Sequence, residues 1–125
     1  VNELFFKMVR IKKRFIIFQI QKKDEESKFN PEISEVNNVV QQCFQKQYGI
    51  FGLGCILSQM KIIFWNQEKL FGVYRVPRDW SRKFNETLLT IDDICNVEVK
   101  FEIFHVSGTI DKAQKWMEDN NFVIQ

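Results

Sequence analysis

The stretch from residue 97 to residue 110 places the tightest limits on what this chain can fold into. Between Val97 and Ile103, apolar residues alternate strictly with charged ones. This period of two is typical of a half-buried antiparallel β-strand, because successive side chains of a strand point to opposite faces. Ser107-Gly108-Thr109 then ends the strand, and Thr109 is a favoured N-cap for a helix that begins at Ile110. The stretch therefore predicts a strand that turns directly into a helix.

The turn between this strand and this helix gathers groups that suit an anion. Backbone N–H groups, two hydroxyls and the N-terminus of a helix meet there, and Lys112 and Lys115 follow on the helix. Helix N-termini bind anions because their free N–H groups and the helix dipole both favour negative charge. The turn is therefore a candidate phosphate site.

The rest of the chain predicts one α+β domain over residues 1–125, with residues 1–9 as an extension and residues 22–30 as a polar loop. The predicted strands are residues 10–21, 55–65, 70–76 and 97–106, and the predicted helices are residues 32–48, 79–93 and 110–120. Asn30 or Ser34 caps the first helix, Gly49 ends it, and residues 50–54 form a loop. The order β-α-β-β-α-β-α indicates a ferredoxin-like or RNA-recognition-motif-like sandwich. In that plan a four-stranded antiparallel sheet carries its helices mainly on one face.

Positive charge is concentrated near the N-terminus. Residues 7–23 carry seven basic side chains and no acidic one, whereas residues 24–125 carry 11 basic and 15 acidic side chains. Two more arginines, Arg75 and Arg78, lie at the end of the third predicted strand. If the first and third strands are adjacent, these groups share a surface with the turn. Clustered Lys and Arg side chains contact nucleic-acid phosphates, and the alternative is an ordinary solvated face.

The sequence carries no recognisable catalytic or metal-binding constellation. It has a single histidine, His105, and three scattered cysteines without a C-x-x-C pair, which are typical of reduced thiols inside the cell. For His105 two interpretations stay open: a structural histidine that bonds the turn backbone, or a direct contact to RNA. No apolar run approaches the roughly 20 residues that span a bilayer, so no membrane partner is expected. With one histidine and no paired carboxylates, the sequence disfavours a small enzyme of this architecture.

Four blocks of the sequence, taken in order, resemble the Pop-five family of ribonuclease P and MRP protein subunits. Residues 8–18 resemble the start of that family, and residues 48–52 resemble its FG-x-x-G segment. Residues 73–78 resemble its RVPR strand end, and residues 105–114 resemble its HVSGTI-x-K-x-Q signature, which is the most specific of the four.

The resemblance implies a non-catalytic subunit of an RNA enzyme. Such a subunit binds and braces the catalytic RNA that cleaves the 5′ leader from precursor tRNA, and the related MRP particle processes ribosomal RNA. The implied partners are that RNA, a thirty-kilodalton barrel-type subunit and other particle proteins, with precursor tRNA engaged indirectly. The resemblance also implies that the protein binds no cofactor, and that the particle uses Mg ions through its RNA. In a eukaryotic cell the location is the nucleus or nucleolus.

Charge pattern and motif position together give a set of candidate RNA-binding residues and no catalytic or metal-binding one. The candidates are Arg10, Lys12, Lys13, Arg14, Arg75, Arg78, His105, Ser107, Gly108, Thr109, Lys112 and Lys115. The alternative from another class is a protein–protein adaptor of a larger complex that makes no direct contact with RNA.

Overall fold

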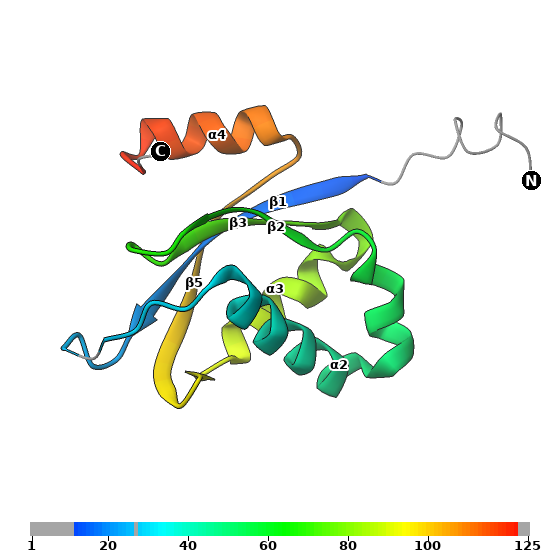
Figure 1. The fold of residues 1–125 in the computed structure, drawn as a ribbon. Coiled ribbons are helices and arrows are strands. Elements are labelled where there is room, and N and C mark those ends of the chain that lie inside the picture. The colour runs from blue at the N-terminus through cyan, green and yellow to red at the C-terminus, as the bar shows by residue number, and fades with distance from the viewer. Residues whose placement is uncertain (1–11, 27, 123–125) are drawn as a thin grey trace, which may run out of the picture.

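The computed structural model describes residues 12–26 and 28–122 of the chain. Candidate Arg10 and the predicted extension over residues 1–9 lie outside these ranges. The elements, in order, are β1 (Lys13–Lys22), α2 (Ile33–Leu57), β2 (Lys61–Asn66), β3 (Phe71–Pro77), the 3-10 helix η1 (Arg78–Trp80), α3 (Ser81–Thr90), β4 (Asp93–Ile94), β5 (Val97–Ser107) and α4 (Ile110–Asp119) (Figure 1).

The strands form one antiparallel sheet in the order β2-β3-β1-β5-β4. The predicted α+β class and the adjacency of the first and third strands are confirmed. The predicted number of four strands is wrong, because the two-residue β4 adds a fifth at the edge of β5. Cys95 and Asn96 between them have positive φ angles of 52° and 67°, which reverse the chain tightly. Two residues are too few to show a period, and the predicted helix over 79–93 includes the first of them, Asp93.

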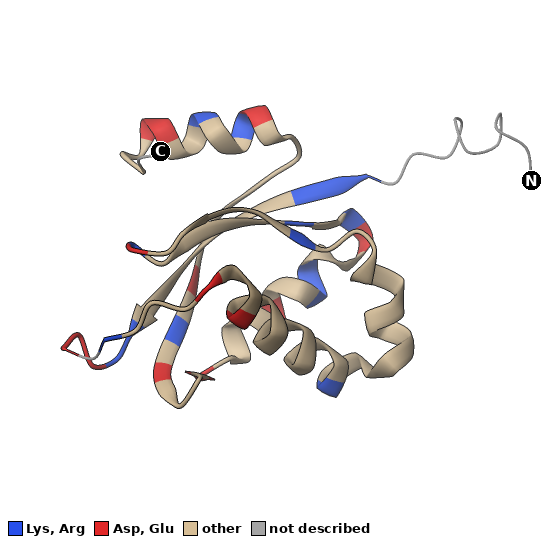
Figure 2. Ribbon diagram, viewed as in Figure 1, with Lys and Arg blue, Asp and Glu red and all other residues tan. Residues whose placement is uncertain are grey.

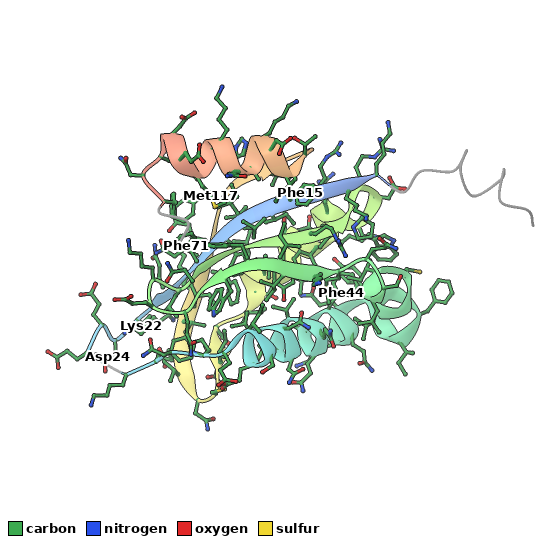
Figure 3. The ribbon with its side chains drawn as sticks, turned by 45° about the horizontal axis from the view of Figure 1, so that its top comes forward. Phe15, Lys22, Asp24, Phe44, Phe71 and Met117 are labelled. Carbon is green, nitrogen blue, oxygen red and sulfur yellow. The ribbon has the colours of Figure 1, made fainter. Side chains whose placement is uncertain are left out.

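Helices cover both faces of the sheet (Figure 1). On one face α2 and α3 bury Phe44, Phe84 and Leu88 against strand residues that include Phe18 and Tyr74. On the opposite face lies α4, which buries a second, smaller cluster. That cluster consists of Ile17, Phe71, Val73, Ala113 and Met117 (Figure 3). The expectation that the helices lie mainly on one face therefore holds for α2 and α3, whereas α4 makes a third layer.

Helix α2 is longer than the sequence predicts, because it continues through a kink. Gly49 has φ 76° and ψ 178°, a backbone conformation that is open essentially to glycine alone. The helix then resumes to Leu57, so the predicted loop over 50–54 and a strand starting at 55 are wrong. A short apolar run cannot be assigned to helix or strand by periodicity. Glu32 is the N-cap of this helix, and its backbone N donates to Glu35 Oε1 at 3.2 Å. Neither Asn30 nor Ser34 is the cap.

Strand β5 contains an irregularity that decides where its last residues point. Ile17 of β1 pairs with His105, but the next residue, Phe18, pairs with Ile103, so Phe104 has no partner opposite. An extra residue of this kind is a β-bulge, and beyond it the side chains change faces. Ile103 packs against the α2/α3 core, whereas His105 faces α4. Strict alternation along the strand would place His105 on the same face as Ile103, and the bulge places it on the opposite face.

Candidate nucleic-acid interface

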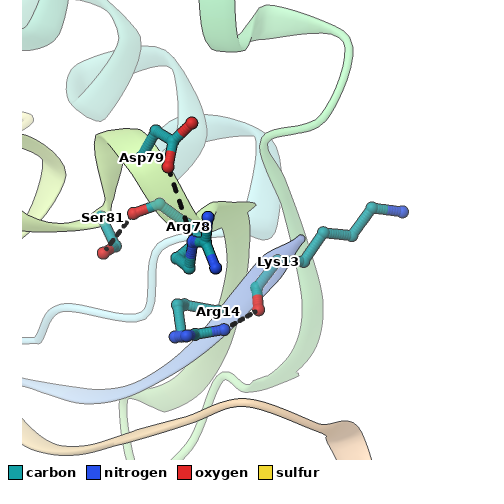
Figure 4. A network of polar contacts seen from close by, with 5 residues as sticks. All are labelled: Lys13, Arg14, Arg78, Asp79 and Ser81. Atoms are coloured by element: carbon teal, nitrogen blue, oxygen red, sulfur yellow. Dashed lines mark hydrogen bonds and ion pairs between the residues drawn. The ribbon is translucent and has the colours of Figure 1, made fainter. Parts of the chain in front are cut away.

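The start of β1 and the end of β3 lie side by side and bring basic residues together. Lys13 pairs with Pro77 and Arg14 with Val76. The backbone N of Arg78 donates to the carbonyl oxygen of Lys12 at 2.7 Å, which extends the pairing past the strand ends. Lys12, Lys13, Arg14 and Arg78 therefore lie at one end of the sheet. Figure 4 shows Lys13, Arg14 and Arg78 there.

Arg14 connects this basic end to the turn before α4. Its Nη1 donates to the carbonyl oxygen of Lys13 at 3.0 Å and lies 3.7 Å from the point where a Cβ on Gly108 would stand. The next residue, Phe15, pairs with Ser107 across β1 and β5. The fold thus joins two segments, near residues 14 and 108, that are far apart in the sequence.

The turn itself has the predicted geometry at Thr109. The Thr109 hydroxyl accepts a hydrogen bond from the backbone N of Lys112 at 3.2 Å, so the N-cap is confirmed. Ser107 is only 4% exposed, and its Oγ is buried without a hydrogen-bond partner in the described part of the chain. Gly108, Thr109 and Lys112 are exposed. The surface of the turn is therefore formed by Gly108 and Thr109 rather than by the Ser107 hydroxyl.

The remaining candidates differ in how exposed their charged groups are and in whether those groups already have a partner. Arg75 is half-buried, and its Nε donates to the carbonyl oxygen of Gln59 at 3.3 Å. Arg78 Nε lies 3.5 Å from Asp79 Oδ1, but both side chains are well exposed and such surface pairs contribute little. Lys112 and Lys115 are exposed on α4, which carries blue segments in Figure 2.

His105 stacks on Trp116 of α4. The ring centroids are 5.3 Å apart, and the planes are 6° from parallel. One face of the imidazole is therefore covered by protein, and the side chain is half-buried. This contact links β5 to α4 and gives His105 a packing role. Of the two interpretations of His105, the structural one is thus realised through stacking on Trp116, and the contact to RNA stays a prediction.

A family model described as Rpp14/Pop5 matches residues 14–118, which is most of the chain. The chain belongs to the Rpp14/Pop5 family. A similar curated protein, "Ribonuclease P/MRP protein subunit POP5" of Schizosaccharomyces pombe, is 25% identical over 116 residues, which cover 86% of this chain and 84% of the relative. A chain in a cryo-EM structure of yeast ribonuclease MRP has the same fold, with a TM-score of 0.62 and 14% identity. The match covers 90% of this chain and 94% of that one.

This member of the Rpp14/Pop5 family carries one more basic residue that the sequence did not single out. Lys61 of β2 is the cross-strand partner of Arg75, and its side chain is exposed. Lys61 lies in the middle of the predicted strand over residues 55–65. Only the register of β2 on β3 places it opposite Arg75. No sequence signal marks that register.

Three further features of the described part of this Rpp14/Pop5 protein concern metal binding, membrane insertion and thiol chemistry. Over residues 12–26 and 28–122 there is no group of three His, Cys, Asp or Glu side chains placed to hold a metal ion. None of the helices in those ranges is long and apolar enough to cross a membrane. The thiol of Cys95 donates to Glu35 Oε2 at 3.1 Å, and this hydrogen bond raises the pKa of Cys95, which disfavours a reactive thiolate.

Proposed function

We propose that this chain is a protein subunit of a ribonuclease P/MRP particle that binds and braces its RNA. Two findings support the assignment to the particle: the Rpp14/Pop5 family match and the similarity to a subunit of that name along most of both chains. In this proposal the subunit serves 5′ maturation of precursor tRNA and, in an MRP particle, processing of ribosomal RNA.

The observation that supports RNA binding is the convergence of three segments at one end of the sheet. The start of β1, the end of β3 and the turn before α4 meet through the Arg78–Lys12 backbone bond and the approach of Arg14 to Gly108. Lys and Arg at this end neutralise phosphates, and the exposed turn with its capped helix N-terminus offers N–H groups to another phosphate. Contacts of this kind position an RNA without reading its sequence.

In this proposal the subunit carries no chemistry of its own. The RNA holds the Mg ions and cleaves, while the protein fixes the shape of the RNA by neutralising charge where strands approach. Its proposed neighbours are a thirty-kilodalton barrel-type subunit and other particle proteins, and precursor tRNA is engaged indirectly. The proposed location is the nucleus or nucleolus, where such particles work in eukaryotes.

The RNA that co-purifies with the chain tests this function. A tagged chain expressed in its own cells is purified after ultraviolet crosslinking, and the bound RNA is sequenced. We expect strong enrichment of one or two structured RNAs, those of ribonuclease P and MRP. Recovery of the protein with no enriched RNA would exclude the proposal.

A second candidate, a protein adaptor without direct RNA contact, is favoured by one surface. Beyond the kink of α2, Ile50 is 76% exposed and Phe51 is 86% exposed. No charged residue lies between Lys46 and Lys61, and this part of the ribbon has neither blue nor red in Figure 2. An exposed apolar and uncharged surface suits a protein and offers nothing to phosphate. Nuclease treatment before purification separates the candidates, because a pure adaptor keeps all its partners.

A further inference from the structure

Three cations lie on one face of the sheet near its basic end. Two of the cations, Lys61 and Arg75, are cross-strand partners. Arg75 also pairs with Phe15, so a row of Lys61, Arg75 and Phe15 crosses β2, β3 and β1. Ser107 continues the row on β5 as the partner of Phe15. Lys13 pairs with Pro77, two residues beyond Arg75, and therefore lies on the same face one step along the strands. This face is the one that α4 covers, because Phe15 packs into the α4 cluster.

The Lys61–Arg75 pair costs stability by itself. Directly opposite residues on antiparallel strands have Cβ atoms only about 5 Å apart, and like charges in that position repel. Among the described residues, neither Lys61 nor Arg75 forms an ion pair with a carboxylate. Within the described part of the chain, the Arg75 guanidinium makes one hydrogen bond, from Nε to the carbonyl oxygen of Gln59. Its two terminal nitrogens remain available to a ligand.

An anion placed between the two side chains removes this repulsion. A guanidinium and an ammonium group together suit a phosphate, since arginine can donate two parallel hydrogen bonds to it and lysine adds a compact charge. The row from Lys61 to Ser107 crosses three strand spacings, or roughly 14 Å. It is therefore long enough to extend the surface at the turn before α4 to the outer edge of the sheet.

We propose that Lys61 and Arg75 form a phosphate-binding pair, with Lys13 beside it, that extends the RNA interface to the edge strand β2. This inference rests on the proposed RNA-binding function and adds a site to it. The ligand is a backbone phosphate of structured RNA. In the bound state the pair stabilises the complex, whereas in the free protein it destabilises the fold.

The test measures RNA affinity and stability in the same variants. Binding of Lys61→Gln and Arg75→Gln to the RNA that co-purifies with the chain is measured over a salt series, and unfolding in urea is measured without RNA. Lys69→Gln is the matched control, because it removes an exposed lysine from the connection between the same two strands. Lys13→Gln serves as the reference for the basic start of β1.

We expect Lys61→Gln to bind RNA roughly tenfold more weakly than the wild type, which is about the effect of one lost hydrogen bond to a charged group. The slope of log affinity against log salt should become shallower by about 0.7 to 0.9, the value for one phosphate contact. Stability without RNA should stay the same or rise, and Lys69→Gln should change neither quantity.

Two results separate failure of the pair from failure of the function. If Lys13→Gln weakens binding while Lys61→Gln behaves like Lys69→Gln, the pair is overturned and the RNA-binding function stands. If the wild type does not bind the RNA, the function itself fails. A loss of affinity in Lys61→Gln that merely follows a loss of stability would also overturn the pair, because it would show a structural role.

Discussion

The ring of His105 lies 5.3 Å from the ring of Trp116 and within 6° of parallel to it. The contact occurs just after the β-bulge of β5, where Phe104 also stacks on Trp116 with centroids 6.2 Å apart. Both side chains meet Trp116 because the bulge turns His105 towards α4. Helix α4 buries only Ala113 and Met117 completely, so these aromatic contacts contribute much of its attachment to the sheet.

Trp116→Ala should therefore loosen α4. We expect the free energy of unfolding to fall by about 2–3 kcal/mol, less than the roughly 3–5 kcal/mol of a fully buried aromatic residue, because Trp116 is half-buried. Urea denaturation measures this. His105→Phe is the control: it keeps a stacked ring, so stability should change by no more than about 0.5 kcal/mol. RNA affinity should also persist in His105→Phe, and a clear loss would instead assign His105 to the RNA surface.

The kink of α2 allows a matched pair of glycine substitutions. Gly49→Ala should destabilise the protein by about 1–3 kcal/mol, because alanine is strained at φ 76° and ψ 178°. Gly54→Ala should stabilise by about 0.5–1 kcal/mol, since Gly54 is helical and a Cβ there meets nothing within 4 Å. Thermal or urea unfolding of both variants measures the difference. Equal effects would show that Gly49 has no special backbone role.

The N-cap of α4 predicts a modest effect of its own. Thr109→Ala removes the acceptor for the backbone N of Lys112 and should cost about 1 kcal/mol, whereas Thr109→Ser keeps the hydroxyl and should cost much less. The double variant Thr109→Ala with Lys112→Ala should also weaken assembly with RNA. Normal assembly of a folded double variant would limit this turn to a structural role.

Cys95 should react slowly with iodoacetamide when the protein is folded. Its hydrogen bond to Glu35 raises the pKa of the thiol, so at pH 8 a smaller fraction is the reactive thiolate than in the unfolded chain. Mass spectrometry of each cysteine at increasing pH measures the rate. Glu35→Gln removes the negative charge beside the sulfur and should speed the reaction. A folded-state rate equal to that in urea would contradict the hydrogen bond.

Much of this fold follows from local patterns. The strand of 97–106, the Thr109 cap and most of helix α3 could be predicted because each is long or carries a specific signal. The features that were missed have weak local signals: the two-residue β4, the kink at Gly49 and the bulge at Phe104.

The candidate site was predictable as a set of charges but not as an arrangement. Arg14 and Gly108 were both singled out from the sequence, yet their approach depends on pairing between strands nearly a hundred residues apart. The partnership of Lys61 with Arg75 depends on the register of β2, which contains a second irregularity between Ile62 and Phe64. Register is a tertiary property, and a one-residue change would move Lys61 to the other face.

The salt dependence of RNA binding tests the central claim most directly. The affinity of the full chain for the RNA that co-purifies with it is measured from about 50 to 200 mM salt, with Arg14→Gln beside the wild type. Electrostatic contact by the basic end of the sheet predicts that affinity falls steeply with salt, and that Arg14→Gln makes the slope shallower by about 0.7 to 0.9. A flat wild-type slope, or a slope unchanged in Arg14→Gln, would contradict it.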